Sequence, residues 1–328
     1  MKSPAPPASA GGAVVIFGSG GDETTIATAF HVPVLAEAVA AFAAGGRRAV
    51  DGTVGGGGHA ALLRAAGARV LALDRDPVAL ATARAQLGEA DVEYLLAPFG
   101  SAAALAAIQA FRPDRVLLDL GLSSHQVDSQ DRGFTFRPGA PLDMRMTPGL
   151  GATAADVLNT WAQDDLAAAF RDWADERRAA ALARAVIRRR TRAPHAVSDD
   201  FVNAIREVLG KRSGPADFAR LFQALRIAVN GELEQLESAL PALRDALVPG
   251  GRLGVITYHS GEDRIVKHAF REWSRACICP PRQPVCTCRG RPLGRVLEKK
   301  GVRPTAAEIR GNPRARSATL RVFERAEG

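Results

Sequence analysis

The sequence lacks any apolar stretch long enough to cross a membrane. No run of 18 apolar residues occurs among its 328 residues, and the N-terminus has neither a basic segment followed by a continuous apolar stretch nor a twin-arginine signal. We therefore expect a cytoplasmic protein with no membrane partner. Residues 1–27 are rich in Ala, Gly, Pro and Ser, which bury too little surface to offset chain entropy, so a flexible tail is expected there.

Cysteine is scarce and confined to one short segment. The sequence has four, at Cys277, Cys279, Cys286 and Cys288. Disulfides are disfavoured in the cytoplasm. Structural zinc sites usually leave two or more residues within each cysteine pair, whereas each pair here encloses one. We therefore expect a reduced, cysteine-rich hairpin without a metal, and zinc is the alternative.

Acidic residues become sparse toward the C-terminus. The formal charge of the chain is +8, and the segment from Arg264 to Gly328 holds 16 Lys and Arg against 5 Glu. A concentrated cationic surplus favours a polyanionic partner. A second group of basic residues consists of Arg184, Arg188, Arg189, Arg190 and Arg192. These arginines could form a solvated surface or could bind phosphates.

Short apolar runs alternate with helical periods, a pattern typical of an α/β fold with a parallel sheet. Three expected strands end in a carboxylate, at Asp51, Asp74 and Asp119. Helices are expected between them, and another strand follows the turn at Pro249. The expected strands cover 48–51, 69–74, 115–119 and 252–258, and the expected helices 78–87, 101–111 and 262–273.

Strand signals are missing from residues 134–214, where helix signals take over. Thr153 and Asp156 have capping-box spacing, and apolar residues then recur at helical intervals. We therefore expect an inserted helical domain for substrate recognition over 134–214, within a discontinuous core of 28–133 and 215–328. One apolar stripe predicts a long helix that begins near Asp217 and continues past Leu240.

A glycine-rich loop, Asp51–His59, directly follows the first expected strand. Glycines let the backbone approach a ligand closely, and open α/β sheets bind ligands at the carboxyl ends of their strands. The loop also satisfies a dinucleotide fingerprint with Asp74, so an NAD-dependent oxidoreductase is an alternative. Asp51 would repel a pyrophosphate but attract an ammonium or sulfonium group, which favours S-adenosylmethionine.

A series of motifs spread over most of the chain resembles the small-subunit ribosomal RNA cytosine-N4 methyltransferases, the methyltransferase H or MraW family. These motifs are His31–Leu35, Asp51–His59, Asp74–Pro77, Leu118–Ser124, Asp131–Phe134, Pro141–Met146, Asn230–Leu233, His259–Arg264 and Asn312–Ser317. The resemblance implies a Rossmann-like S-adenosylmethionine-dependent methyltransferase core with a helical insertion. It also implies methylation of the N4 amine of a cytidine in 16S ribosomal RNA, with the RNA or the assembled small subunit as partner.

The resemblance also implies a set of cofactor contacts, at Gly57, Gly58, His59, Asp74, Phe99, Asp119 and Gln126. The loop backbone would hold the methionine part, Asp74 the ribose hydroxyls and Phe99 the adenine. We further expect Asp119 to act in catalysis by orienting the amine. The residues expected to bind the target base are Ser123, Ser124, His259 and Ser260.

Three other functions remain open from the sequence. A DNA amino-methyltransferase would share the core, although the Asp-Pro-Pro-aromatic signature of those enzymes is absent after Leu118. An NAD-dependent oxidoreductase would bind NADH rather than S-adenosylhomocysteine. A non-catalytic RNA-binding assembly factor would keep the fold and transfer no methyl group.

Overall fold

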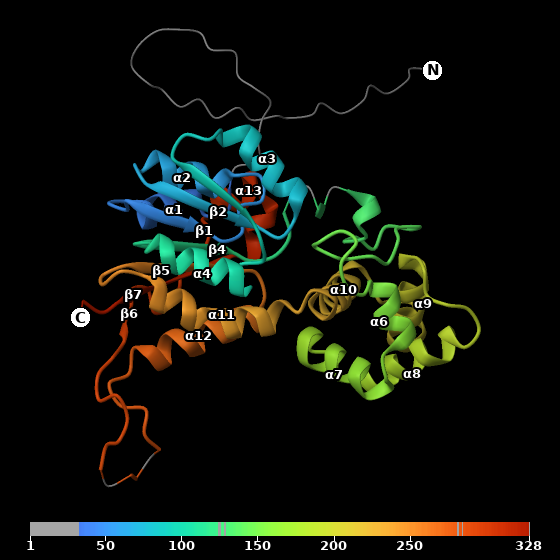
Figure 1. Cartoon of the computed structure of the whole chain (residues 1–328). Coiled ribbons are helices and arrows are strands. Elements are labelled where there is room, and N and C mark those ends of the chain that lie inside the picture. Colours follow the sequence, from blue (N-terminus) through green and yellow to red (C-terminus); the bar gives the residue numbers. More distant parts are fainter. Residues whose placement is uncertain (1–32, 124–125, 128, 281, 284, 328) are drawn as a thin grey trace.

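The structure is a computed structural model that describes residues 33–123, 126–127, 129–280, 282–283 and 285–327. The expected tail and the candidate Ser124 lie outside the described residues. The described chain forms an α/β core and a separate helical unit (Figure 1). None of the helices in the described part of the chain is both long and apolar enough to span a bilayer.

A seven-stranded sheet forms the centre of the core, with strand order β3-β2-β1-β4-β5-β7-β6. Strands β1 to β5 pair in parallel, and β7 runs antiparallel to both β5 and β6. The strands are β1 (Arg48–Asp51), β2 (Arg69–Asp74), β3 (Val92–Leu96), β4 (Arg115–Asp119), β5 (Arg252–Thr257), β6 (Gly294–Val296) and β7 (Thr319–Arg325). The predicted α/β fold is confirmed, while β3, β6 and β7 were not anticipated.

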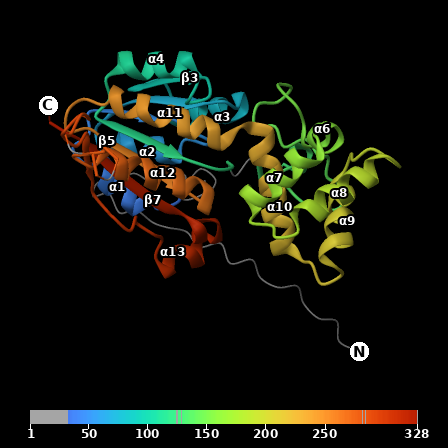
Figure 2. The same cartoon turned by 90° about the horizontal axis from the view of Figure 1, so that it is seen from below.

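Helices cover both faces of this sheet (Figures 1 and 2). Successive strand residues point to opposite faces, so Leu117 packs on one side while Val116 and Leu118 pack on the other. One face is covered by α1 (Ala36–Ala43), α2 (Gly58–Ala65) and α3 (Pro77–Leu87). The opposite face is covered by α4 (Ala102–Phe111), α11 (Glu232–Ala246) and α12 (Ser260–Trp273).

The helical unit has a hydrophobic core of its own. Phe170, Phe201 and Phe222 pack together at its centre, with ring centroids 5.3–5.7 Å apart between neighbours. The predicted capping box of Thr153 and Asp156 is present at its first helix. Its helices are α6 (Ala154–Thr160), α7 (Gln163–Ala174), α8 (Ala179–Arg190), α9 (Ser198–Leu209) and α10 (Pro215–Asn230). Helix α10 belongs to this unit by its packing, whereas the sequence placed it in the discontinuous core.

The long helix expected from Asp217 onward is broken in two at Gly231. This glycine has φ +59°, a left-handed conformation that ends α10 and starts α11. The apolar stripe is divided accordingly, because Leu225 packs in the helical unit whereas Leu236 packs against the sheet. The break therefore redirects the chain from the helical unit back to the core (Figure 2).

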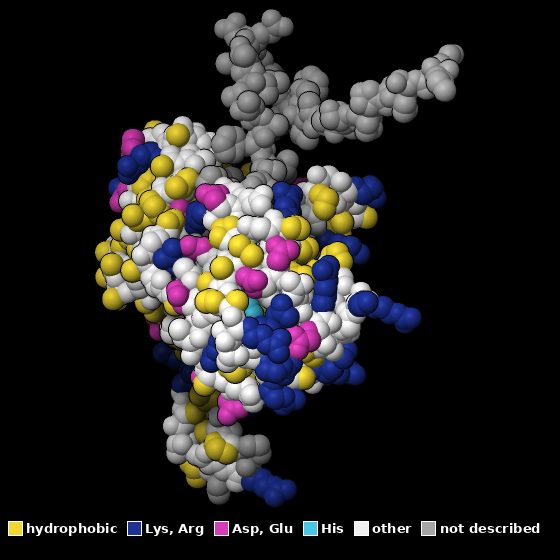
Figure 3. All heavy atoms as spheres, turned by 90° about the vertical axis from the view of Figure 1, so that its right-hand side faces the viewer, with side chains coloured by type: hydrophobic (Ala, Val, Ile, Leu, Met, Phe, Trp, Pro, Cys, Tyr) yellow, Lys and Arg dark blue, Asp and Glu magenta, His cyan; other side chains and the backbone are white. Residues whose placement is uncertain are grey.

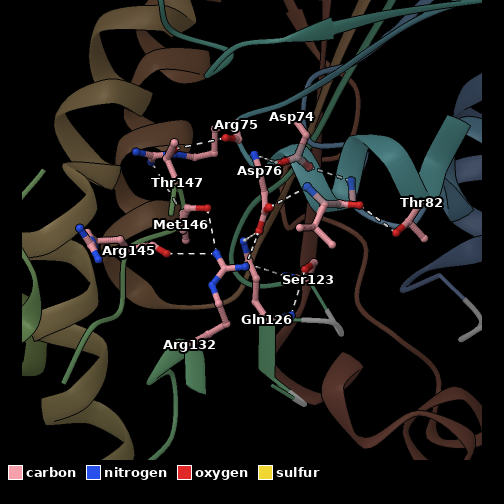
Figure 4. A network of polar contacts seen from close by, with 12 residues as sticks. Asp74, Arg75, Asp76, Thr82, Ser123, Gln126, Arg132, Arg145, Met146 and Thr147 are labelled. Atoms are coloured by element: carbon pink, nitrogen blue, oxygen red, sulfur yellow. Dashed lines mark hydrogen bonds and ion pairs between the residues drawn. The ribbon is translucent and has the colours of Figure 1, made fainter. Parts of the chain in front are cut away.

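A buried ion pair joins the two units (Figure 4). Asp76 is fully buried at the start of α3, and its Oδ2 accepts hydrogen bonds from Arg132 at 2.9 Å and from Gln126 at 3.1 Å. The Arg132 guanidinium also donates to the carbonyls of Arg145 and Met146, at the entrance to the helical unit. A single cation thus binds a core carboxylate and two carbonyls of the inserted segment.

We predict that Arg132→Met destabilises the protein by about 3–5 kcal/mol, because Asp76 would remain buried without its cation. The free energy of unfolding in denaturant measures the effect. Arg171→Met is the matched control, since its pair with Asp172 is exposed and is worth about 0–1 kcal/mol. Equal losses in the two variants would contradict this role of the buried pair.

Candidate active site

A cavity of about 700 Å³ lies beyond the carboxyl ends of β1, β2 and β4, where the strand order reverses. Its lining also includes Met146, Arg226 and Glu232, so it extends to the junction with the helical unit. The sequence-predicted residues that line it are Gly58, His59, Asp74, Phe99, Asp119, Ser123 and Gln126. Gly57, His259 and Ser260 are not among the described residues of the lining.

Two glycines of the loop that follows β1 have different surroundings. Gly55 and Gly57 both have positive φ, +51° and +93°. A Cβ on Gly57 would lie 3.2 Å from Leu87 and 3.4 Å from the Ala83 Cα, so Gly57 makes room for α3. A Cβ on Gly55 would make only an ordinary contact, 3.7 Å from Ser123 Cβ, and both of these residues line the cavity.

Asp74 ends β2 and is held in one orientation by the backbone. Its Oδ2 accepts the Gly55 N–H and its Oδ1 accepts the Asp76 N–H, each at 2.9 Å. Burial raises the pKa of Asp74, and these two hydrogen bonds oppose the rise. Because a carboxylate has about four acceptor positions, Asp74 retains acceptor capacity toward the cavity that it lines.

Asp119 ends β4 within a buried polar network. Its Oδ1 accepts the Tyr258 hydroxyl at 2.8 Å, and its Oδ2 lies 3.4 Å from Nδ1 of His59. The other ring nitrogen of His59 donates to the Val34 carbonyl at 2.8 Å, so Nδ1 is the nitrogen that faces Asp119. Burial raises the pKa of Asp119, while His59 and the Tyr258 hydrogen bond act in the opposite direction.

Asp51 lies fully buried at the end of β1, beneath the glycine loop. Its Oδ1 accepts the Thr53 N–H at 3.2 Å, whereas its Oδ2 has no hydrogen-bond partner among the described residues. Burial raises the pKa of Asp51 to about 7, against the attraction of His59. A buried carboxylate oxygen without a partner is costly, so this position favours a nearby positive charge.

His259 and Ser260 occupy the start of α12 instead of the cavity wall. His259 caps the helix, and its Nε2 lies 3.1 Å from Glu262 Oε1. Glu262 does line the cavity, and its Oε2 accepts the Tyr258 N–H at 2.8 Å. Burial alone would raise the pKa of Glu262, but His259 and Arg226 lower it below its usual value. His259 therefore positions a lining residue.

Several lining residues were not identified as site residues from the sequence. Tyr258 ends the expected strand 252–258, and Glu262 lies inside a quoted motif, but nothing local indicates that either faces Asp119. Asn312 and Arg314 also line the cavity, and they belong to the last of the quoted motifs. Membership in a motif was the one signal that pointed to Glu262, Asn312 and Arg314, and no such signal pointed to Tyr258.

Comparison with known proteins gives a consistent result. Residues 28–326 match the MraW methylase family. The chain is 54% identical over 301 residues to a Gemmatimonas aurantiaca protein named ribosomal RNA small subunit methyltransferase H, and the match covers 90% of this chain and 96% of that protein. A protein of the same name from Thermomicrobium roseum is 46% identical, and the match covers 90% of this chain and 93% of that protein. Another, from Heliobacterium modesticaldum, is 45% identical, and the match covers 84% of this chain and 91% of that protein. The chain therefore belongs to the MraW methylase family.

Proposed function

We propose that this protein uses S-adenosylmethionine to methylate the N4 amine of a cytidine in 16S ribosomal RNA, in the cytoplasm. One observation carries the proposal. Asp74 and Asp119 end two strands and line one cavity, and Asp51 ends the strand between them and lies buried beneath the glycine loop. The names of its relatives agree with this activity.

The residues around the cavity fit the parts of S-adenosylmethionine. Asp74 retains acceptors for the ribose hydroxyls, and Phe99 offers an apolar wall for the adenine. The first N–H groups of α2, at Gly58 and His59, have no side-chain cap and suit the methionine carboxylate. The unpartnered Asp51 oxygen favours the positive charges of the ligand. Gln126 is fixed by Asp76 at the edge of the same cavity.

An NAD-type dinucleotide fits this site less well. The negative charges of its pyrophosphate would lie in a cavity lined by Asp74 and Asp119, with Asp51 buried at the strand end between them. The sheet also carries an antiparallel strand, β7, between β5 and β6, unlike the classic dinucleotide-binding order of 3-2-1-4-5-6. Both observations favour the methyl donor.

The bound donor supplies an electrophilic methyl group, and the protein has to align an acceptor nitrogen with it. The N4 lone pair of cytosine is delocalised into the ring, so the amine needs orientation. Asp119 accepts a hydrogen bond from this amine, because Tyr258 and His59 hold its carboxylate in place from two sides. As the nitrogen is methylated, the Asp119 carboxylate, which lines the cavity, would accept the proton that leaves.

The surface on the side of the helical unit suits an RNA partner. Figure 3 views the molecule from the side of the helical unit, where Lys and Arg side chains gather over one part of the face. Ser123 lines the cavity and is a candidate contact to the base, and Ser124 remains a second candidate. The target base has to leave its stack to enter, which costs a few kcal/mol and costs least in non-helical RNA. The partner is ribosomal RNA, naked or within the small subunit.

The proposed activity predicts that cells lacking this protein lose one N4-methylated cytidine from small-subunit RNA. Mass mapping of the RNA nucleosides measures this, and a plasmid copy of the gene should restore the modification. Loss of a modified base from DNA instead would indicate a DNA methyltransferase. An unchanged nucleoside profile combined with altered subunit assembly would indicate a non-catalytic assembly factor.

We predict that Asp74→Ala weakens S-adenosylhomocysteine binding by about 1.5–3 kcal/mol, roughly 10- to 150-fold in Kd, because the ribose loses a charged acceptor. Calorimetry measures the affinity, and Asp172→Ala in the helical unit is the control. Asp74 also holds the Gly55 N–H, so a donor analogue without ribose hydroxyls should be tested too. An equal loss for that analogue would contradict the ribose contact.

Asp119→Asn should lower the single-turnover methylation rate by about 100-fold or more, with a smaller effect on donor affinity, since the amine is oriented chiefly in the transition state. Tyr258→Phe should act in the same direction more weakly, because it removes only the hydrogen bond that holds Asp119. Rate and affinity are measured on the same variants. Full recovery of the rate at saturating donor would limit Asp119 to cofactor binding.

A further inference from the structure

A hairpin of residues 274–293 connects α12 to β6 and projects away from the core (Figure 1). It carries all four cysteines of the chain. Their sulfur atoms all lie within 4.8 Å of one another. The Cys286 Sγ is 3.8 Å from Cys277, 3.8 Å from Cys279 and 3.5 Å from Cys288, and the Cys277 and Cys288 sulfurs are 3.9 Å apart.

These separations match the edges of a metal–thiolate tetrahedron. Four sulfurs at about 2.3 Å from a zinc ion lie about 3.8 Å from one another. A disulfide would require about 2.05 Å, and all four cysteines are free. In an iron–sulfur cluster the four cysteines are divided among two or four iron atoms, so their sulfurs do not all surround a single ion. The distances therefore fit one shared metal ion.

Among its described residues, the hairpin has few other contacts that hold its tip together. Its apolar residues Ile278 and Val285 are 40% and 71% exposed, so they provide no packed core. The described side-chain links near the tip are hydrogen bonds from Gln283 to Thr287 and to the Val285 carbonyl. At the base, Arg289 pairs with Glu272 of α12 at 2.7 Å. A cross-link at the cysteines would close the loop in between.

The surroundings also favour thiolates over thiols. The hairpin sequence contains four arginines and no Asp or Glu, so its charge compensates the negative charge of a four-thiolate site. The backbone N–H of Ile278 donates to Cys288 Sγ at 3.3 Å, a hydrogen bond that stabilises a thiolate.

We propose that Cys277, Cys279, Cys286 and Cys288 bind one zinc ion in tetrahedral coordination and that this ion fixes the fold of the hairpin. The proposal replaces the metal-free loop expected from the sequence. The one-residue spacing within each cysteine pair is no obstacle, because the hairpin brings all four sulfurs together. The site lies on a segment separate from the cavity residues, so it is independent of the proposed methyl transfer.

The test measures the metal content of the full chain, purified under reducing conditions without a metal-chelating tag. Elemental analysis should find about one zinc per chain. Cys286→Ser/Cys288→Ser should lower the zinc content about tenfold or more, since two of the four ligands are lost. His268→Ala is the control, because this exposed imidazole on α12 is a possible adventitious ligand outside the cluster, and it should leave the zinc content unchanged.

A second measurement on the unmodified protein covers the case in which the double variant fails to fold. Cobalt exchanged for zinc should give the visible and thiolate charge-transfer bands of a tetrahedral four-sulfur site. The proposal is overturned if reduced protein neither carries stoichiometric zinc nor binds added zinc at micromolar concentration. It is also overturned if the folded double variant retains zinc, if iron replaces it at full stoichiometry, or if thiol titration finds two disulfides.

Discussion

The burial of three carboxylates at neighbouring strand ends is the constraint around which the core is arranged. Asp51, Asp74 and Asp119 end neighbouring strands, and burial raises the pKa of all three. The protein compensates each one differently, with the His59 imidazole, backbone N–H groups and the Tyr258 hydroxyl. One oxygen of Asp51 has no such compensation among the described residues. The site thus favours a ligand that brings positive charge, as the proposed methyl donor does.

The position of the cavity depends on how the two units are connected. Asn230 ends α10, and its side chain binds the Met144 carbonyl and the Met146 N–H, each at 2.8 Å. The left-handed Gly231 then turns the chain into α11. Arg226 and Glu232 flank this turn, pair with each other and line the cavity. The connection between the two units therefore forms part of the cavity wall.

The sequence predicted those features that depend on local patterns. The buried strands β1, β2, β4 and β5 were found because they are short apolar runs, whereas β3 lies at the sheet edge with only Val92 buried. A helical period continues across Gly231, so the pattern does not reveal the change of axis there. Asp74 and Asp119 could be assigned from their strand ends. Tyr258 could not, because its contact with Asp119 joins residues 139 apart and depends on the pairing of β4 with β5.

The orientation of His59 shows that the two ends of the described chain act together on the site. His59 points Nδ1 at Asp119 because its other nitrogen binds the Val34 carbonyl. The next residue, Leu35, has φ +56°, a conformation that costs about 1–2 kcal/mol for a residue with a side chain. The Leu35 N–H donates to the Glu308 carboxylate at 2.5 Å, across 273 residues. Helix α13 (Ala306–Gly311) thereby holds the strained segment that aligns the imidazole.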